Sequence, residues 1–189
     1  MLRRSVSRGV RRTRRLRIGR SDGFTLLELI FICAVIGLLS AIALPTVFRS
    51  RMAANETSAY GAIRTVHVAQ LTYALTCGYG NYASQFPDLG NPNGDGYLGV
   101  DLTYNASPLK SGYNFVLQPG QNGLSGFTDC NGAGTTTDYY VSATPVAFGN
   151  SGRRAFASNQ GQTIWQDRTG IAPVEPFVVA GSVMRMEAY

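Results

Sequence analysis

Side chains able to do catalysis or bind a metal are few in this chain, and their spacing does not assemble a catalytic site. His67 is the only histidine among 189 residues. It falls in a stretch with helical periodicity, which favours an interfacial side chain over a general base or a ligand. A metal site of the ordinary histidine type is therefore not expected, because the sequence offers no second histidine as a ligand. Because no nucleophile, base and orienting group can be grouped from the other residues, the sequence predicts no enzyme activity and no cofactor.

Carboxylates in a turn-rich segment are the one candidate for cation binding. Asp88, Asp95 and Asp101 lie in and around the run Asn-Pro-Asn-Gly-Asp-Gly at residues 91–96. Oxygen ligands of this kind suit Ca²⁺, but the segment has neither the spacing of an EF-hand loop nor its terminal bidentate glutamate. An ordinary turn is the favoured interpretation, and the three aspartates are the alternative calcium candidates.

The three cysteines divide between an apolar run and the polar remainder of the chain. Cys33 lies inside the apolar run, where the simplest interpretation is a small membrane-buried side chain. Cys77 and Cys130 lie in the polar part and are compatible with a disulfide in an oxidising compartment. Two free thiols are the alternative, because sequence alone does not bring two sulfur atoms within bonding distance.

A single carboxylate interrupts an otherwise membrane-grade apolar run. Residues 24–44 carry no charge except Glu28, and at about 1.5 Å per residue they are long enough to span a hydrocarbon layer of about 30 Å. A charge in that layer costs about 2.5–3.5 kcal/mol on insertion scales, so an intramembrane carboxylate is a functional candidate. A glutamate that reaches the interface without a partner is the alternative.

Positive charge is concentrated ahead of this apolar run. The formal net charge is +6, yet residues 1–22 alone carry +8 and the rest of the chain −2, because one end holds nine arginines and a single opposing acid, Asp22. The arginine block predicts a topology signal that keeps this end cytoplasmic, rather than a nucleic-acid arm. No nucleic-acid partner is predicted, since nothing after Gly23 has the charge of a phosphate-binding surface.

These residues must be positioned by a long helix. The pattern predicts one nearly continuous helix from about Phe24 to about Thr76, with a kink at Pro45, where one backbone donor is missing. Beyond the proline, apolar positions recur at spacings of three, four or seven, which predicts a buried stripe of Ala59, Ile63, Val66 and Tyr73. Four charged residues are assigned to positions off that stripe: Arg49, Arg51, Glu56 and Arg64.

The remainder is predicted to form a small antiparallel sheet, which gives an α+β fold with the helix packed on the sheet. Strands are expected at residues 113–118, 139–146, 154–158 and 163–167, the last two as a hairpin. The tail 173–189 is expected to add an edge strand or to pack beneath the sheet. The resulting organisation is a leader at 1–23, a membrane and assembly helix at 24–45, its amphipathic continuation at 46–77, an irregular loop at 78–112 with a short helical turn near 86–89, and the sheet at 113–189.

The run Gly23-Phe24-Thr25-Leu26-Leu27-Glu28-Leu29, with the apolar residues up to Pro45, resembles the amino terminus of type IV pilins and of type II secretion pseudopilins. The resemblance covers residues 20 to about 76 and implies a pilin-like fold. It also implies cleavage between Gly23 and Phe24 by a prepilin peptidase on the cytoplasmic side and N-methylation of Phe24. Asp22 departs from the basic residue often found before the cleavage point.

The same resemblance gives Glu28 a partner. Within one helix the Phe24 amine is one turn from Glu28 and could partly neutralise it. In a helical filament of many copies, the Phe24 amine of a neighbouring subunit can meet the Glu28 carboxylate instead. A unit pair at about 4 Å and an effective dielectric constant near 20 gains about 4 kcal/mol, comparable to the cost of burial, so the pair sets register more than stability. Small residues after Glu28 permit close helix approach: Gly37, Ser40, Ala41 and Ala43.

The expected function is that of a structural subunit of a type IV pilus or a similar filament. Its expected partners are other copies of the chain, the inner membrane, the prepilin peptidase and the pilus or type II secretion machinery. The precursor is expected in the inner membrane with its leader cytoplasmic and its head periplasmic, and the mature chain in an extracellular or periplasmic filament. One alternative is a type II secretion pseudopilin, and another is an anchored binding module whose loop at 78–112 contacts DNA or a surface.

Overall fold

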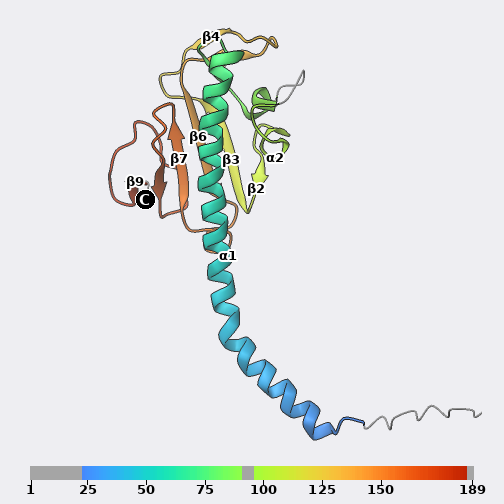
Figure 1. The fold of residues 1–189 in the computed structure, drawn as a ribbon. Helices are drawn as coiled ribbons and strands as arrows, with labels where there is room; N and C mark the ends of the chain where they lie inside the picture. Colours follow the sequence, from blue (N-terminus) through green and yellow to red (C-terminus); the bar gives the residue numbers. More distant parts are fainter. Residues whose placement is uncertain (1–22, 91–95, 187–189) are drawn as a thin grey trace, which may run out of the picture. The chain divides into compact units, whose positions relative to one another are not determined.

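The computed structural model describes residues 23–90 and 96–186. The chain divides into two units, one ending at Ile42 and the other beginning at Ala43. Helix α1 (Leu26–Thr76) belongs to both units. In the second unit, which we call the head, α1 packs against antiparallel sheets, and this α+β arrangement is the predicted fold class (Figure 1).

Helix α1 ends where the sequence predicts and contains Pro45 in its interior. Proline has no backbone N–H, so the carbonyl oxygen of Ala41 loses its usual donor, yet the helix continues on both sides. Before the proline the helix is apolar all round, whereas after it charged and polar residues interrupt the sequence and one face is buried against the sheet. The first part suits a uniform apolar surrounding, and the second packs on a partner along one side.

The predicted stripe is buried against the sheet. Ala59, Ile63, Val66 and Tyr73 have no exposed surface and share one core with side chains of β3, β6 and β7. Three of the charged residues assigned off the stripe are exposed: Arg49, Arg51 and Arg64. The prediction for Glu56 is wrong, because this residue is buried. It lies three positions before Ala59, and that spacing puts it on the buried face.

The larger sheet has six antiparallel strands in the order β2-β3-β6-β7-β8-β9. The four predicted strands are present as β3 (Tyr113–Pro119), β6 (Tyr139–Pro145), β7 (Ala155–Asn159) and β8 (Trp165–Asp167). The predicted hairpin is confirmed by the pairing of β7 with β8. The tail supplies an edge strand, β9 (Val183–Arg185), next to β8. The opposite edge is β2 (Leu109–Lys110).

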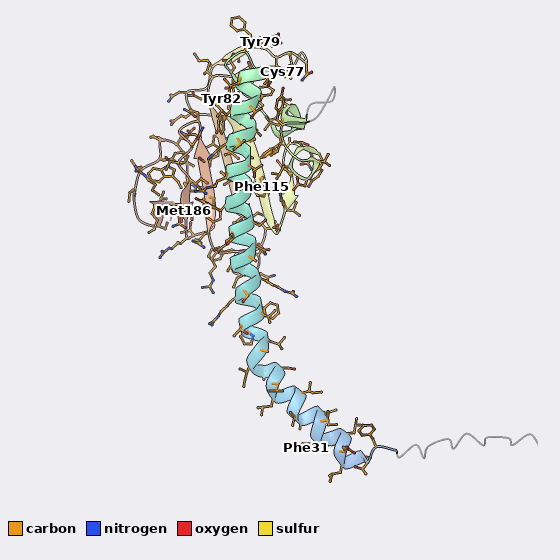
Figure 2. The ribbon with its side chains drawn as sticks, in the orientation of Figure 1. Phe31, Cys77, Tyr79, Tyr82, Phe115 and Met186 are labelled. Atoms are coloured by element: carbon orange, nitrogen blue, oxygen red, sulfur yellow. A yellow bond between two sulfur atoms is a disulfide. The ribbon has the colours of Figure 1, made fainter. Side chains whose placement is uncertain are left out.

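The two faces of this sheet are covered by different segments. Alternate residues of β3, such as Phe115, are buried against α1 (Figure 2). On β6, Tyr140 faces the other way, where its ring stacks on Phe177 at a centroid distance of 6.2 Å and its hydroxyl donates to the carbonyl oxygen of Pro173 at 2.7 Å. Trp165 stacks on Phe177 at 5.6 Å. The tail thus covers the sheet face that α1 leaves open.

A second, three-stranded sheet and several short elements occupy the segment before and between the main strands. Its order is β1-β5-β4, with β1 (Tyr82–Ala83), β5 (Gly134–Thr136) and β4 (Ser125–Thr128). The segment predicted as an irregular loop at 78–112 also holds the 3₁₀ helix η1 (Phe86–Gly90), where a helical turn was expected, and the one-turn helix α2 (Val100–Thr103). The side-chain amide of Gln70 ties this segment to α1 by hydrogen bonds of 2.9 Å to both the N–H and the carbonyl oxygen of Ala83.

Candidate functional site

The start of α1 is built by a threonine cap. The Thr25 hydroxyl accepts a hydrogen bond from the backbone N–H of Glu28 at 3.2 Å, and the Thr25 carbonyl oxygen accepts one from Leu29 at 3.2 Å. Thr-x-x-Glu is the spacing of a capping box, so Glu28 also suits the positive end of the helix dipole. Gly23 and Phe24 precede the helix and are exposed.

Glu28 has no ion-pair partner among residues 23–90 and 96–186. Its carboxylate is exposed in a helical stretch whose other side chains carry no charge until Arg49. The side chains of this stretch, Phe31 among them, stand out from α1 without covering one another (Figure 2). Within its described residues, a single chain therefore supplies no cation that would neutralise the Glu28 carboxylate.

The apolar part of α1 satisfies the length and composition of a membrane-crossing helix, and none of its most apolar window is buried within the chain. Pro45 lies at the end of this part and remains helical. Cys33 is exposed on it as a free thiol. One long apolar helix near the N-terminus is thus available as a membrane anchor.

The head contains an ion pair of a buried carboxylate, Glu56, with a partly exposed guanidinium, Arg154, and the sequence did not predict it. The Oε2 atom of Glu56 lies 2.7 Å from Nε and 2.6 Å from Nη2 of Arg154. Its Oε1 atom accepts hydrogen bonds from the backbone N–H groups of Arg153 at 2.8 Å and Arg154 at 3.3 Å. Glu56 therefore fixes the entry to β7 against α1. The signal available in the sequence was its spacing of three from Ala59.

His67 is an interfacial side chain, as the sequence predicts. Its Nε2 atom lies 2.9 Å from the hydroxyl oxygen of Ser158 on β7. That hydroxyl donates its proton to the carbonyl oxygen of Thr163 at 2.8 Å, so His67 must be the donor and carries its proton on Nε2. Burial, reinforced by the nearby charge of Arg64, lowers the pKa of His67 to about 4. The ring is accordingly neutral at pH 7 and has a structural role.

The disulfide anticipated from the cysteine count is present between Cys77 and Cys130, whose Cα atoms are 5.0 Å apart. Asp129 organises the loop beside it by accepting hydrogen bonds from the backbone N–H groups of Asn131 at 2.8 Å and Ala133 at 2.7 Å. Its other oxygen accepts the Tyr73 hydroxyl at 2.7 Å. Burial and this hydrogen bond raise the pKa of Tyr73 above its ordinary range, so the phenol stays a donor.

Two of the three calcium candidates, Asp88 and Asp101, lie among the described residues, and each contacts polar or charged side chains of the chain itself. Asp88 accepts hydrogen bonds from Ser84 at 3.2 Å and Gln85 at 3.1 Å, and burial raises its pKa. Asp101 pairs with the Lys110 ammonium group at 2.5 Å. Asp95 lies outside the described residues. Within the described ranges, no three histidine, cysteine or acidic side chains gather around a possible metal position.

The second half of α1 leaves an apolar face uncovered. Val68 and Leu75 are 66% and 78% exposed, and Leu71 lies between them on the same side of the helix. Tyr79 continues this face just beyond the helix end and projects away from the head (Figure 2). This exposed face of Val68, Leu71, Leu75 and Tyr79 lies opposite the buried stripe. Val68, Leu71 and Leu75 extend over about two turns of the helix, and large apolar side chains aligned in this way suit contact with another protein surface.

Comparison of the chain with family models, with curated proteins and with solved structures yields no match.

Proposed function

We propose that this chain is a structural subunit of a type IV pilus or a similar filament, made as a single-pass membrane precursor and assembled through α1. The observation that carries the proposal is Glu28, an exposed carboxylate in the apolar part of α1 without an ion-pair partner in the described part of the chain. In lipid or in a packed bundle of helices, such a group needs a counter-charge. Cleavage between Gly23 and Phe24 would create an amine four residues away.

Two features of the head support the same proposal. The exposed face of Val68, Leu71, Leu75 and Tyr79 gives the second half of α1 a surface for neighbouring helices. The Cys77–Cys130 disulfide fits a head that works in an oxidising compartment. A contact between unlike surfaces of identical subunits generates a helical filament when its rotation does not close a ring, and we propose that the contacts of this chain are of that open kind.

The role of Glu28 is tested with two substitutions. Glu28→Gln removes the charge but retains a side chain that can complete the capping box, whereas Glu28→Ala removes both. We expect both variants to enter the membrane and both to show a strong loss of filament incorporation, measured as the share of the chain in sheared filaments. Normal incorporation of Glu28→Gln, with loss only in Glu28→Ala, would assign Glu28 to capping alone and remove this argument for assembly.

Processing is tested independently by the mass of the mature amino terminus. Residue Phe24 with one added methyl group is the expected result, and an intact leader on assembled protein would contradict it.

Deleting the gene separates the two filament systems. Loss of surface filaments supports a pilus, and a secretion defect with filaments retained assigns the chain to a secretion pseudofilament.

A further inference from the structure

A cavity of about 530 Å³ lies at the end of the head where α1 enters it. It is lined by Glu56, Phe148, Gly149, Arg153, Arg154 and Arg168. These residues come from α1, from the connection between β6 and β7, and from the turn after β8. We call this the arginine cavity. Two of these segments place three guanidinium groups, those of Arg153, Arg154 and Arg168, around one space, and α1 adds the carboxylate of Glu56.

The charge of the arginine cavity is positive because its only carboxylate is already occupied. Glu56 receives the guanidinium of Arg154 at 2.6 Å and the backbone N–H of Arg153 at 2.8 Å. The guanidinium groups of Arg153 and Arg168 are exposed and have no ion-pair partner within residues 23–90 and 96–186. Two unneutralised planar cations facing one cavity favour an anionic ligand with phosphate-like oxygens.

The rim of the arginine cavity is apolar and held in place. Phe148 is 60% exposed, and its ring lies so close to Gly170 that a Cβ atom there would be 2.5 Å from it. Gly170 also has a φ of +80°, which suits glycine. Val146 extends the exposed apolar surface on the same connection. Protein surfaces at the boundary between lipid and water typically combine aromatic rings with cationic side chains.

The arginine cavity follows the apolar part of α1 closely along the chain. Glu56 comes twelve residues after Leu44, or about 18 Å along a helix. Arg49 and Arg51 lie between them, about 8 and 11 Å beyond Leu44, and neither has an ion-pair partner in the described ranges. Arg49 is two turns before Glu56 and shares its side of the helix. Cationic groups therefore continue from the end of the apolar run up to the cavity.

We propose that the arginine cavity binds anionic phospholipid headgroups of the bilayer that holds α1. This inference rests on the membrane-anchored state within the proposed function. Arg153 and Arg168 bind the headgroup phosphate, and Phe148 and Val146 enter the interfacial layer. In the membrane-anchored state this contact holds the head against the anionic leaflet until the head is withdrawn for assembly.

The test uses the full chain in nanodiscs of phosphatidylcholine, with and without about one quarter phosphatidylglycerol. Phe148→Trp places a reporter at the rim, and lipids that carry a nitroxide on the headgroup quench it on contact. The unchanged chain provides the background, because its one tryptophan, Trp165, is buried between Phe177 and Arg185. We expect several-fold stronger quenching in discs that contain phosphatidylglycerol, and loss of the difference at high salt.

Charge variants locate the contact. Arg153→Gln with Arg168→Gln, in the Phe148→Trp background, should abolish the lipid-dependent quenching. The control is Arg64→Gln with Lys110→Gln, which removes the same charge from positions that do not line the arginine cavity; it should leave the quenching unchanged. Equal quenching in both kinds of disc, or quenching that survives loss of Arg153 and Arg168, would overturn the proposal.

Two further outcomes are decisive. Retention of the chain in membranes after alkaline carbonate extraction establishes anchoring, so a retained chain without quenching refutes the headgroup site and leaves the proposed function standing. A chain that is not retained refutes the anchoring on which both rest. If Arg153→Gln with Arg168→Gln weakens binding of a DNA duplex and leaves lipid quenching intact, the cavity is a nucleic-acid surface and the lipid proposal fails.

Discussion

Glu56 is the buried charge on which the contact between α1 and β7 depends. Replacement with alanine would leave Arg154 half-buried without its carboxylate and would leave the backbone N–H groups of Arg153 and Arg154 without an acceptor. Removing one partner of a buried pair costs about 3–5 kcal/mol. Arg154 is partly exposed, so we expect Glu56→Ala to lower the free energy of unfolding by about 3 kcal/mol, measured by denaturant unfolding in detergent.

The matched control is Arg51→Ala, which removes an exposed charge from the same helix and should change stability by less than about 0.5 kcal/mol. Glu56→Gln retains the shape and an acceptor, so its loss should be intermediate. A loss for Glu56→Ala no larger than about 1 kcal/mol would mean that the pair behaves as a solvent-screened surface bridge, contrary to its burial.

His67 gives the head a defined response to acid. Its pKa is about 4 in the folded chain and about 6.5 when exposed, so the folded state favours the neutral ring. The stability that this contributes is complete above pH 6.5 and is lost as the pH falls from 6.5 to 4. The loss over that window is about 3 kcal/mol.

Comparison with His67→Gln isolates this effect from the titration of carboxylates, which is common to both proteins. The free energy of unfolding of the unchanged chain, measured at a series of pH values, should fall toward that of His67→Gln as the pH drops from 6.5 to 4. A constant difference between the two proteins across this window would show that His67 does not titrate on unfolding.

At the level of elements, the Cys77–Cys130 disulfide joins the end of α1 to the loop after β4. The two cysteines are 53 positions apart, and closing a loop of that size stabilises the fold by about 4 kcal/mol on the chain-entropy model. We expect Cys77→Ser with Cys130→Ser to lose about this much, measured by unfolding without reductant. Cys33→Ser is the control and should be neutral for the head, because Cys33 lies outside the head and is free.

A reductant should lower the stability of the unchanged chain but not that of the double variant. If it lowers both equally, the loss has a cause other than the Cys77–Cys130 disulfide.

The helices and strands differ in how well the sequence predicts them. The buried stripe of α1 and the strands β3, β6, β7 and β8 follow from periodic apolar positions, which many residues repeat. The small sheet was not predicted, because β1 has two residues and β5 three, too few to show alternation. At Ala83 the side-chain amide of Gln70 takes the place of a neighbouring strand, because it bonds both the N–H and the carbonyl oxygen of this residue. No local sequence pattern predicts such a contact.

At the scale of the whole molecule, net charge conceals how charge is distributed. The chain beyond residue 22 carries −2, which argued against any anionic partner. The fold nevertheless gathers Arg153 and Arg168 at one cavity and pairs the nearby acid, Glu56, within the chain. Arg153 and Arg168 flank the paired strands β7 and β8, and Glu56 reaches them from a distant part of the chain. The net charge of the chain does not reveal such a cluster. Glu28, by contrast, stood out in the sequence because its neighbours in the chain are also its surroundings.

The exposed face of α1 makes a prediction about the assembled molecule. Val68 and Leu75 are 66% and 78% exposed, so they contribute little to the fold of a single chain. Burying one such side chain in a neighbouring subunit contributes about 2 kcal/mol, a factor of roughly thirty in affinity. We expect Val68→Glu with Leu75→Glu to keep the stability of the head and its membrane insertion, and to lose most filament incorporation, measured by shearing and electron microscopy.

Leu109→Glu is the control for this pair, because Leu109 is an exposed apolar residue on the edge strand β2, away from the exposed face of α1. It should assemble normally. If the α1 variants assemble as well as the control, the neighbouring subunits do not use this face, and Glu28 alone would have to set the register. If assembly fails in the control too, surface charge in general opposes it, and the apolar face has no special part. Loss confined to the α1 variants requires a second chain on that face, since their own heads remain folded.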